Sequence, residues 1–161
     1  MLDIDVLQND PAWQDVPDAQ SWAHVALNKA ADHLGVEAGE VSIVLCGDAE
    51  ISELNRQWRG QNKATNVLSF PLPEHSGEGA QMLGDIIISL QTTLREANDE
   101  AKPFRDHFSH LVVHGFLHLM GYDHETEEEA EEMETEERKI LFDLEIPDPY
   151  LGTHPIPIDQ R

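Results

Sequence analysis

Hydrophobic and polar residues alternate in several segments of the chain, and this period of two predicts β-strands. The alternation is clear over 2–6 and 41–45, where every second residue is apolar. A third strand is predicted over 65–70. The segment 83–90 is the most apolar of the four, which is typical of a central strand buried on both faces.

In other segments apolar residues recur at the spacing of an α-helix. The predicted helices span 18–34, 48–59, 91–101, 103–120 and 125–145. The order of strands and helices predicts an α+β fold, with a small mixed β-sheet of about four strands and helices packed on it.

We expect residues 1–161 to form a single domain, because the length suits one core and no linker or internal repeat is visible. The segment 73–82 is rich in turn-forming residues and predicts a loop. The helix over 125–145 is acidic, with nine glutamates in 125–137. Its apolar residues still fall at helical spacing, so we interpret the glutamates as a solvated helix face. A short irregular tail is predicted over 147–161.

The second predicted helix has recognisable ends. Asp48 is a residue type that caps helix N-termini, and Gly60 is suited to end the helix. Its inner face is predicted to consist of Ile51, Leu54 and Trp58, which lie three to four residues apart.

Three histidines are spaced as metal ligands near the end of the fourth predicted helix. His114 and His118 stand at positions i and i+4, on one face of the helix and about one turn apart. Gly121 can adopt the left-handed conformation that ends a helix, so the chain can turn and bring His124 back. A single histidine is usually a packed core residue, but three at this spacing predict a metal site on the helix and the following turn.

The predicted ligand set favours a catalytic site. Three imidazoles leave the fourth position of a zinc ion open to water, and zinc can lower the pKa of that water from 15.7 to roughly 7. The spacing is also that of a zinc-protease motif, in which Glu follows the first histidine and acts as general base. Here that position is Gly115, so a metallopeptidase would lack its base.

The chain has a formal net charge of −22. Residues 125–161 alone carry 13 Asp and Glu against three Lys and Arg. This field repels phosphate, which argues against nonspecific binding to DNA, RNA or an anionic membrane. A nucleic-acid enzyme of this composition needs a local basic patch or a partner that delivers the substrate. The lack of an apolar run long enough to cross a membrane, and the single Cys46, predict a cytoplasmic protein.

Cations cluster at one place in this acidic chain. Arg56, Arg59 and Lys63 lie within eight residues, at the end of the second helix and in the turn that follows. A guanidinium can stabilise charge on a phosphoryl oxygen during displacement at phosphorus. The alternative is an ordinary solvated helix end, where cations also favour the helix dipole.

Other polar residues have less specific interpretations. His107 and His110 continue the histidine stripe and are predicted to lie on the helix surface or in a cleft. Asp85, in the apolar strand, could orient a ligand histidine, or serve as a cap or in a turn. Asp123 and Glu125 flank the third histidine, and either could replace the missing base; spacing does not choose between them.

Three blocks of sequence together resemble the YbeY family of bacterial endoribonucleases. They are 58–71 (WRGQNKATNVLSFP), 83–86 (LGDI) and 114–124 (HGFLHLMGYDH), in the same order as in the family. The resemblance implies a zinc-dependent, single-strand-specific endoribonuclease that matures the 3′ end of small-subunit ribosomal RNA and acts in ribosome quality control. It also implies one zinc ion per chain, bound by His114, His118 and His124, and a requirement for Arg59 in activity.

The chain departs from the family pattern in the first block, where Asn62, Ala64 and Asn66 replace the common residues. Two carboxylates are therefore amides, and we expect no acid or base role at those positions. A non-catalytic ribosome-assembly factor with a structural zinc is the main alternative function. In either case we expect the ribosome or a ribosomal protein as a partner.

Overall fold

The computed structural model describes residues 2–72 and 81–150. In these residues the chain forms four strands, five α-helices and one short 3-10 helix. In chain order they are β1 (Leu2–Gln8), η1 (Pro11–Asp15), α1 (Ala19–Leu34), β2 (Gly39–Cys46), α2 (Asp48–Arg59), β3 (Val67–Pro71), β4 (Met82–Ser89), α3 (Leu90–Asp99), α4 (Phe104–Leu119) and α5 (Glu127–Asp143). The predicted order of strands and helices is confirmed. Most of the predicted loop over 73–82, and residues 151–161 of the predicted tail, lie outside the described residues.

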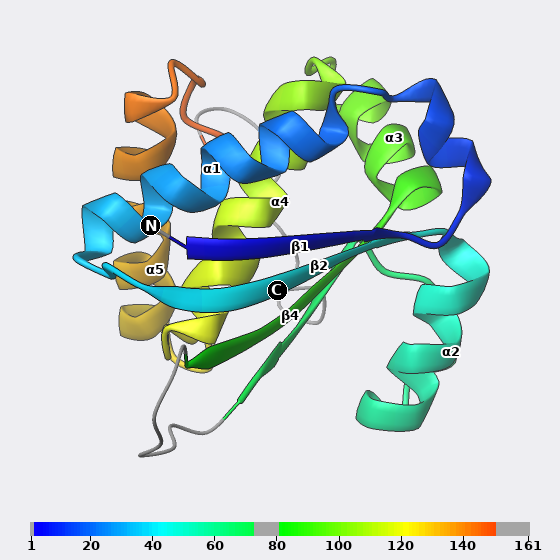
Figure 1. The fold of residues 1–161 in the computed structure, drawn as a ribbon, viewed down its shortest axis with the longest axis horizontal. Helices are drawn as coiled ribbons and strands as arrows, with labels where there is room; N and C mark the ends of the chain where they lie inside the picture. The colour runs from blue at the N-terminus through cyan, green and yellow to red at the C-terminus, as the bar shows by residue number, and fades with distance from the viewer. Residues whose placement is uncertain (1, 73–80, 151–161) are drawn as a thin grey trace.

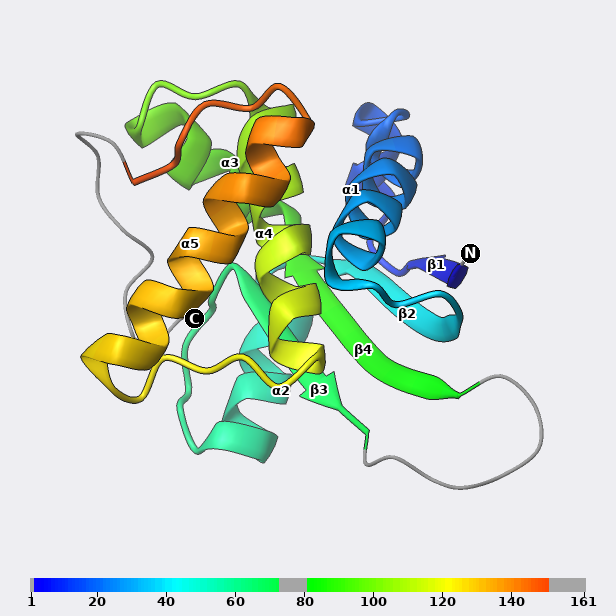
Figure 2. The same cartoon turned by 90° about the vertical axis from the view of Figure 1, so that its left-hand side faces the viewer.

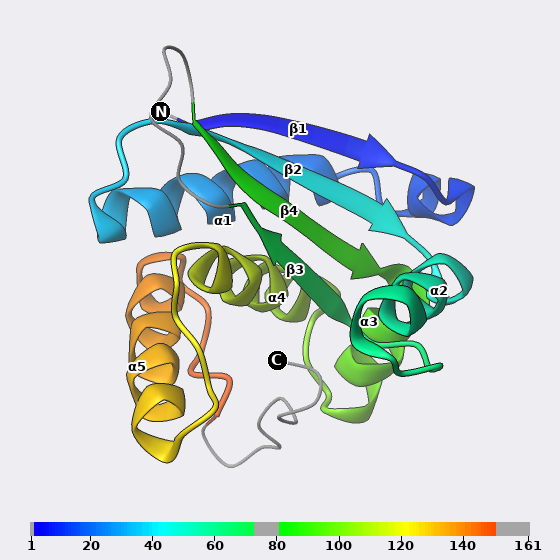
Figure 3. The same ribbon diagram turned by 90° about the horizontal axis from the view of Figure 1, so that it is seen from below.

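The strands form one mixed sheet in the order β1-β2-β4-β3 (Figure 3). β1, β2 and β4 are parallel, and β3 pairs antiparallel with β4 at the edge. Ile43 of β2 pairs with Val6 of β1 and with Ile86 of β4, so apolar side chains line up across the centre of the sheet. The α+β class and the mixed sheet are therefore confirmed.

Helices α1 and α4 cover one face of the sheet, and α5 packs against α4 and α1 on the side away from the strands (Figures 1 and 2). This places α4 between the sheet and α5, which explains why all of its residues from 107 to 117 are buried. The core lies between the sheet and these helices. Its largest fully buried side chains include Trp13, Phe108, Phe116, Leu27, Ile43 and Ile86.

Gly115 allows α4 to approach the sheet closely. A Cβ at this position would lie 2.8 Å from Cγ2 of Ile86 and 3.1 Å from Oγ of Ser69. The Ser69 hydroxyl donates a hydrogen bond of 3.2 Å to the Gly115 carbonyl, which joins the helix to strand β3. The glycine thereby sets the distance between α4 and the strands that carry the rest of the site.

The opposite face of the sheet is covered at one end by α2. A small apolar cluster there consists of Cys46, Ile51, Leu68 and Ile87. The prediction that Trp58 belongs to the inner face of α2 is wrong, because its side chain is 68% exposed. Trp58 does contact the ring of Phe70, but Phe70 lies on edge strand β3, and in the described chain no further strand follows to cover the indole.

The prediction that Asp48 caps α2 is wrong, because Asp48 is the first residue of the helix. Gly47 occupies the N-cap position, and the Asp48 carboxylate instead accepts hydrogen bonds of 2.6 Å from the hydroxyls of Ser89 and Thr92. Partial burial opposes ionisation of Asp48, but these hydrogen bonds and the guanidinium of Arg95 hold the pKa of its carboxyl below the usual value. Asp48 therefore joins α2 to the β4–α3 connection.

Among the described helices, none is both long enough and apolar enough to span a bilayer.

Candidate metal centre

The end of α4 turns the chain back on itself. The amide of Gly121 donates to the carbonyl of His118 (3.1 Å), and that of Tyr122 donates to the carbonyl of Leu117 (3.0 Å). These two bonds form a Schellman motif, which requires the left-handed conformation that Gly121 adopts at φ +95°. The predicted helix end at Gly121 is thus present, and it directs residues 122–124 toward the side chains of the last helical turn.

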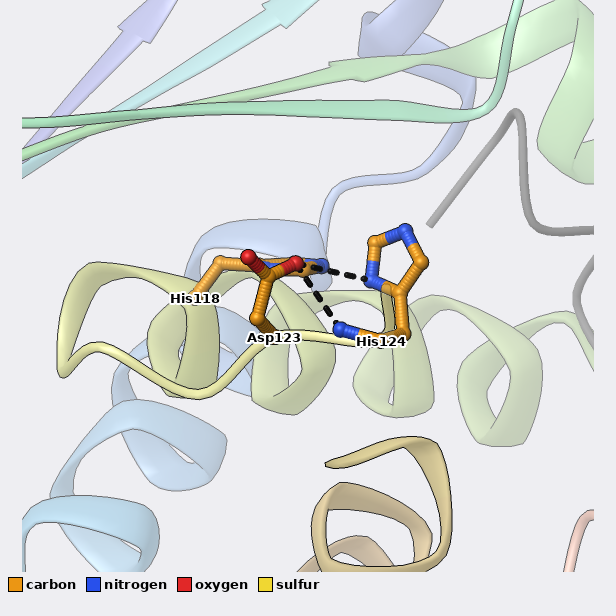
Figure 4. Close-up of side chains that lie close together, drawn as sticks. All are labelled: His118, Asp123 and His124. Atoms are coloured by element: carbon orange, nitrogen blue, oxygen red, sulfur yellow. Dashed lines mark hydrogen bonds and ion pairs between the residues drawn. The ribbon is translucent and has the colours of Figure 1, made fainter. Parts of the chain in front are cut away.

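The three predicted ligand histidines lie together. The ring centroids of His114 and His118 are 4.6 Å apart, and those of His118 and His124 are 4.9 Å apart. The potential ligand atoms of His118, Asp123 and His124 all lie within 4.8 Å of one another, and this group does not include His114. Figure 4 shows these three side chains close together. The carboxylate of Asp123 accepts the backbone N–H of His124 at 2.8 Å, which fixes it beside the imidazoles.

The tautomer of His118 follows from its surroundings. Its Nδ1 lies 3.0 Å from the carbonyl of Tyr122, which can only accept, so Nδ1 carries the proton. The Nε2 lone pair then faces Nε2 of His114 at 3.1 Å. Burial, followed by the neighbouring His114 and His124, lowers the pKa of His118 to about 3. The imidazole is therefore neutral at physiological pH, as a metal ligand must be.

A buried carboxylate faces His114 from the other side. Glu137 of α5 is fully buried, and its Oε1 lies 3.4 Å from Nδ1 of His114. Its Oε2 makes a short contact with Nε2 of His110, and the Tyr150 hydroxyl donates to the same carboxylate at 2.9 Å. Burial opposes ionisation of Glu137, but His110 and His114 lower the pKa of its carboxyl below the usual value.

The interpretation of the glutamate run as a solvated face missed Glu137. One signal was present in the sequence: Glu137 stands four residues after Met133 and three before Ile140, on the apolar stripe of α5. A glutamate on such a stripe has to be paired when it is buried.

This donor set fits a divalent cation. Because Nδ1 of His118 donates to Tyr122, its Nε2 presents a lone pair, 3.1 Å from Nε2 of His114. At this distance a proton or a cation has to lie between the two nitrogens. Nδ1 of His114 lies 3.4 Å from Oε1 of Glu137 and is buried without a hydrogen-bond partner. Imidazole nitrogens together with a nearby carboxylate are the ligands that zinc prefers in proteins.

The imidazoles of His118 and His124 border a pocket of about 420 Å³. We call it the histidine pocket; it is lined by Arg59, Val67, Ser69, Pro71, His118, Gly121, Tyr122, Asp123, His124 and Glu125. Arg59 comes from the end of α2 and donates a hydrogen bond of 3.1 Å to the carbonyl of Ser69 on edge strand β3. The fold thus brings Arg59 beside the histidines, together with both candidate bases, Asp123 and Glu125.

Asp85 lies elsewhere. It is in the middle of β4, on the face of the sheet turned away from α4, where it borders a hollow with Asp3, Glu40 and Ser42. Partial burial raises the pKa of its carboxyl. Successive strand residues point to opposite faces, and the next residue, Ile86, faces α4, so the side chain of Asp85 points away from the histidines. The prediction that Asp85 orients a ligand histidine, or serves as a cap or in a turn, is therefore wrong.

His107 and His110 are buried rather than on the helix surface, each about 3% exposed. His107 pairs with Glu96 of α3 at 2.8 Å, and His110 pairs with Glu137. Both residues border a small pocket at the other end of α4. Of the two predicted positions, the helix surface and a cleft, the structure therefore agrees with the cleft.

The model of the family described as "Endoribonuclease YbeY" matches residues 4–145 of the chain. The chain belongs to the YbeY family. An endoribonuclease YbeY of Rhodopseudomonas palustris is 55% identical over 145 residues, covering 87% of this chain and 76% of that protein. Another, from Bartonella henselae, is 47% identical over 154 residues, covering 93% and 98% of the two chains. The resemblance found in the sequence is confirmed.

A solved structure supports the fold. The solution structure of TM1509 from Thermotoga maritima aligns with a TM-score of 0.52 and 24% sequence identity, covering 94% of this chain and 99% of that one.

Family membership also removes the metallopeptidase alternative, whose general base is absent because Gly115 has no side chain.

Proposed function

We propose that this chain is a zinc-dependent endoribonuclease that cuts single-stranded RNA. The observation that carries the proposal is the histidine pocket, in which Arg59 lies beside His118 and His124 in a chain that belongs to an endoribonuclease family. One zinc ion per chain would be held by His114, His118 and His124. When bound, the ion would act as a Lewis acid toward a phosphoryl oxygen and would make a nucleophile available at neutral pH.

The protein would hold the ligands ready for the ion. The Tyr122 carbonyl fixes His118 with Nε2 toward the site, and the carboxylate of Glu137 faces Nδ1 of His114 at 3.4 Å. Such partners set the tautomer and orientation of ligand histidines, which lowers the cost of assembling the site.

Arg59 would bind the scissile phosphate and stabilise the negative charge that increases on its oxygens in the transition state. One of its five N–H donors is used in the hydrogen bond to the Ser69 carbonyl, which anchors the side chain at the edge of the sheet. The remaining donors lie at the pocket, where a planar fork can contact two phosphoryl oxygens at once.

Of the two candidate bases, we favour Asp123. Its carboxylate lies among the imidazoles and is held by the His124 amide, whereas Glu125 is an exposed residue at the pocket rim. Asp123 would accept the proton released by the nucleophile. An Asp123→Asn variant that keeps its zinc but no longer cuts would support this role, and loss of zinc would make Asp123 a ligand instead.

The substrate we propose is ribosomal RNA, cut near the 3′ end of the small-subunit RNA, with a further role in ribosome quality control. Support comes from family membership. The net charge of −22 favours a basic protein partner, for which the ribosome offers many candidates, because the acidic surface repels free RNA at long range.

The decisive experiment compares cleavage of a labelled single-stranded RNA by zinc-loaded wild type, His118→Ala and Arg59→Ala, with zinc content and circular dichroism measured for each. We expect His118→Ala to lose zinc and cleavage together. Arg59→Ala should keep its zinc and lose roughly two to three orders of magnitude in rate, the cost of removing a transition-state donor. Equal cutting by all three would overturn the proposal, and no cutting by a zinc-loaded wild type would favour the assembly-factor alternative.

A further inference from the structure

Trp58 is a large aromatic side chain exposed next to the residue that enters the histidine pocket. It is 68% exposed, and its ring meets the ring of Phe70 edge-on at a centroid distance of 6.1 Å. Exposing so much apolar surface costs free energy that burial would recover. The sequence pattern predicted a buried Trp58, so its exposure calls for an explanation.

Arg59 connects these two rings to the pocket. Its guanidinium carbon lies 5.9 Å from the centroid of the Phe70 ring, within the range of a cation–π contact. The same side chain lines the histidine pocket and bonds to the backbone of β3. Trp58, Phe70 and Arg59 therefore form one continuous surface across the edge of the sheet, which we call the aromatic platform.

The charge around the platform differs from that of the rest of the chain. Residues 54–72 contain three Lys and Arg and no Asp or Glu, in a protein of net charge −22. Glu53, just outside this stretch, is paired with Arg56, which leaves Arg59 at the pocket. Asp85, the partner of Phe70 across β4, is the acidic neighbour that the adjacent strand contributes. Aromatic rings beside cations suit nucleic acid better than an apolar peptide.

We propose that the aromatic platform stacks a base of single-stranded RNA on Trp58, while the backbone of the strand passes Arg59 into the histidine pocket. The inference rests on the proposed function and adds the binding site for a nucleotide next to the cut. Every base has a π-face, so stacking of this kind is tolerant of sequence. A base within a duplex is already stacked and paired, and the platform therefore selects for single strands.

The test measures binding without cleavage, with metal-free protein and a fluorescein-labelled RNA of about ten nucleotides, by fluorescence anisotropy at fixed low salt. We expect Trp58→Ala to weaken binding about tenfold, the usual loss for one stacked base. Trp58→Phe should retain most of the affinity. Phe142→Ala is the matched control, because Phe142 is 79% exposed on α5 and should leave affinity unchanged.

An abasic strand of the same length separates stacking from charge. Wild type should bind it about as weakly as Trp58→Ala binds RNA, and Trp58→Ala should bind both strands alike. Thermal unfolding monitors the fold, which an exposed residue should hardly affect. Equal affinity of wild type and Trp58→Ala for RNA would overturn the inference. It would also be overturned if Trp58→Ala weakened binding to the abasic strand as much as it weakened binding to RNA.

These outcomes are independent of whether the chain cuts RNA. If wild type cuts RNA and Trp58→Ala binds it unchanged, the endoribonuclease proposal stands and the stacking proposal fails. If binding depends on the bases and on Trp58 but the protein does not cut, the stacking proposal stands and the endoribonuclease proposal fails.

Discussion

Glu137 is a carboxylate in the interior of the molecule, held between two imidazoles and a phenol. Replacing it with Gln keeps the shape but removes the charge that faces Nδ1 of His114. We expect Glu137→Gln to lower zinc affinity by about ten- to a hundredfold, as is typical when the partner of a ligand histidine is lost. Competition with a chromogenic chelator measures this.

The comparison for Glu137 is Glu128→Gln, which removes an exposed charge from the same helix. Unchanged zinc affinity in a folded Glu137→Gln protein would show that the carboxylate serves packing alone.

Cys46 should be chemically inert in the folded protein. Burial, followed by the nearby carboxylates of Glu50, Asp10 and Asp48, raises the pKa of its thiol to about 12. Only the thiolate reacts, and at pH 8 it would make up ~0.01% of the thiol at that pKa. We expect a disulfide reagent at pH 8 to leave Cys46 unmodified in the folded protein in buffer, and to modify one thiol per chain in the protein unfolded in urea. Rapid reaction of the native protein would contradict this.

At the scale of the element, the position of α4 depends on Gly115. Replacing it with Ala has two opposing effects. Ala favours the helix by up to about 1 kcal/mol. Its Cβ would, however, lie 2.8 Å from a fully buried Ile86, and overpacking costs about 1–3 kcal/mol. We expect the clash to prevail, with a net loss of about 1 kcal/mol in urea unfolding. A more stable Gly115→Ala protein would show that the helix can shift.

Helix α2 is held by Asp48, and this makes its attachment dependent on pH. The folded-state pKa of Asp48 is below the unfolded value, so its stabilisation is present at neutral pH and is lost as pH falls through the folded pKa. We expect Asp48→Asn to lose about 1 kcal/mol at pH 7, a small value because solvent screens the partly exposed group. The free energy of unfolding should be measured for both proteins from pH 7 to about pH 2, and its difference between Asp48→Asn and wild type should shrink below pH 4. A constant difference would exclude the charge as its cause.

The order of elements could be predicted because hydrophobic periodicity is local, and so could the helix end at Gly121. Contacts between distant segments could not. Trp58 follows the period of α2, but its exposure depends on β3 being the edge of the sheet. Asp85 was a candidate partner for a ligand histidine, but its position in β4 places the side chain on the opposite face of the sheet. The link between His114 and Glu137 joins α4 to α5, and neither the histidine spacing nor the charge run contains it.

At the scale of the whole molecule, the distribution of charge shapes how RNA can approach. Most of the chain repels phosphate, and the stretch 54–72 beside the histidine pocket is free of carboxylates. Within the described residues, a long RNA would therefore meet its most favourable local sequence in this stretch, beside the platform. Such a distribution suits an enzyme that acts on one exposed strand presented to it, and disfavours coating of RNA along its length.

The position of α4 between the sheet and α5 couples two equilibria. Glu137 reaches His114 only when α5 is docked, so a cation that prefers the oriented imidazole also prefers the docked helix. By thermodynamic linkage, zinc at a thousand times its Kd would add about 4 kcal/mol to the stability of the fold. Amide hydrogens of α5 would then exchange more slowly in the metal-bound protein, although α5 is not the helix that carries the three histidines. The supply of zinc would thus influence how long the folded molecule persists as well as whether it acts.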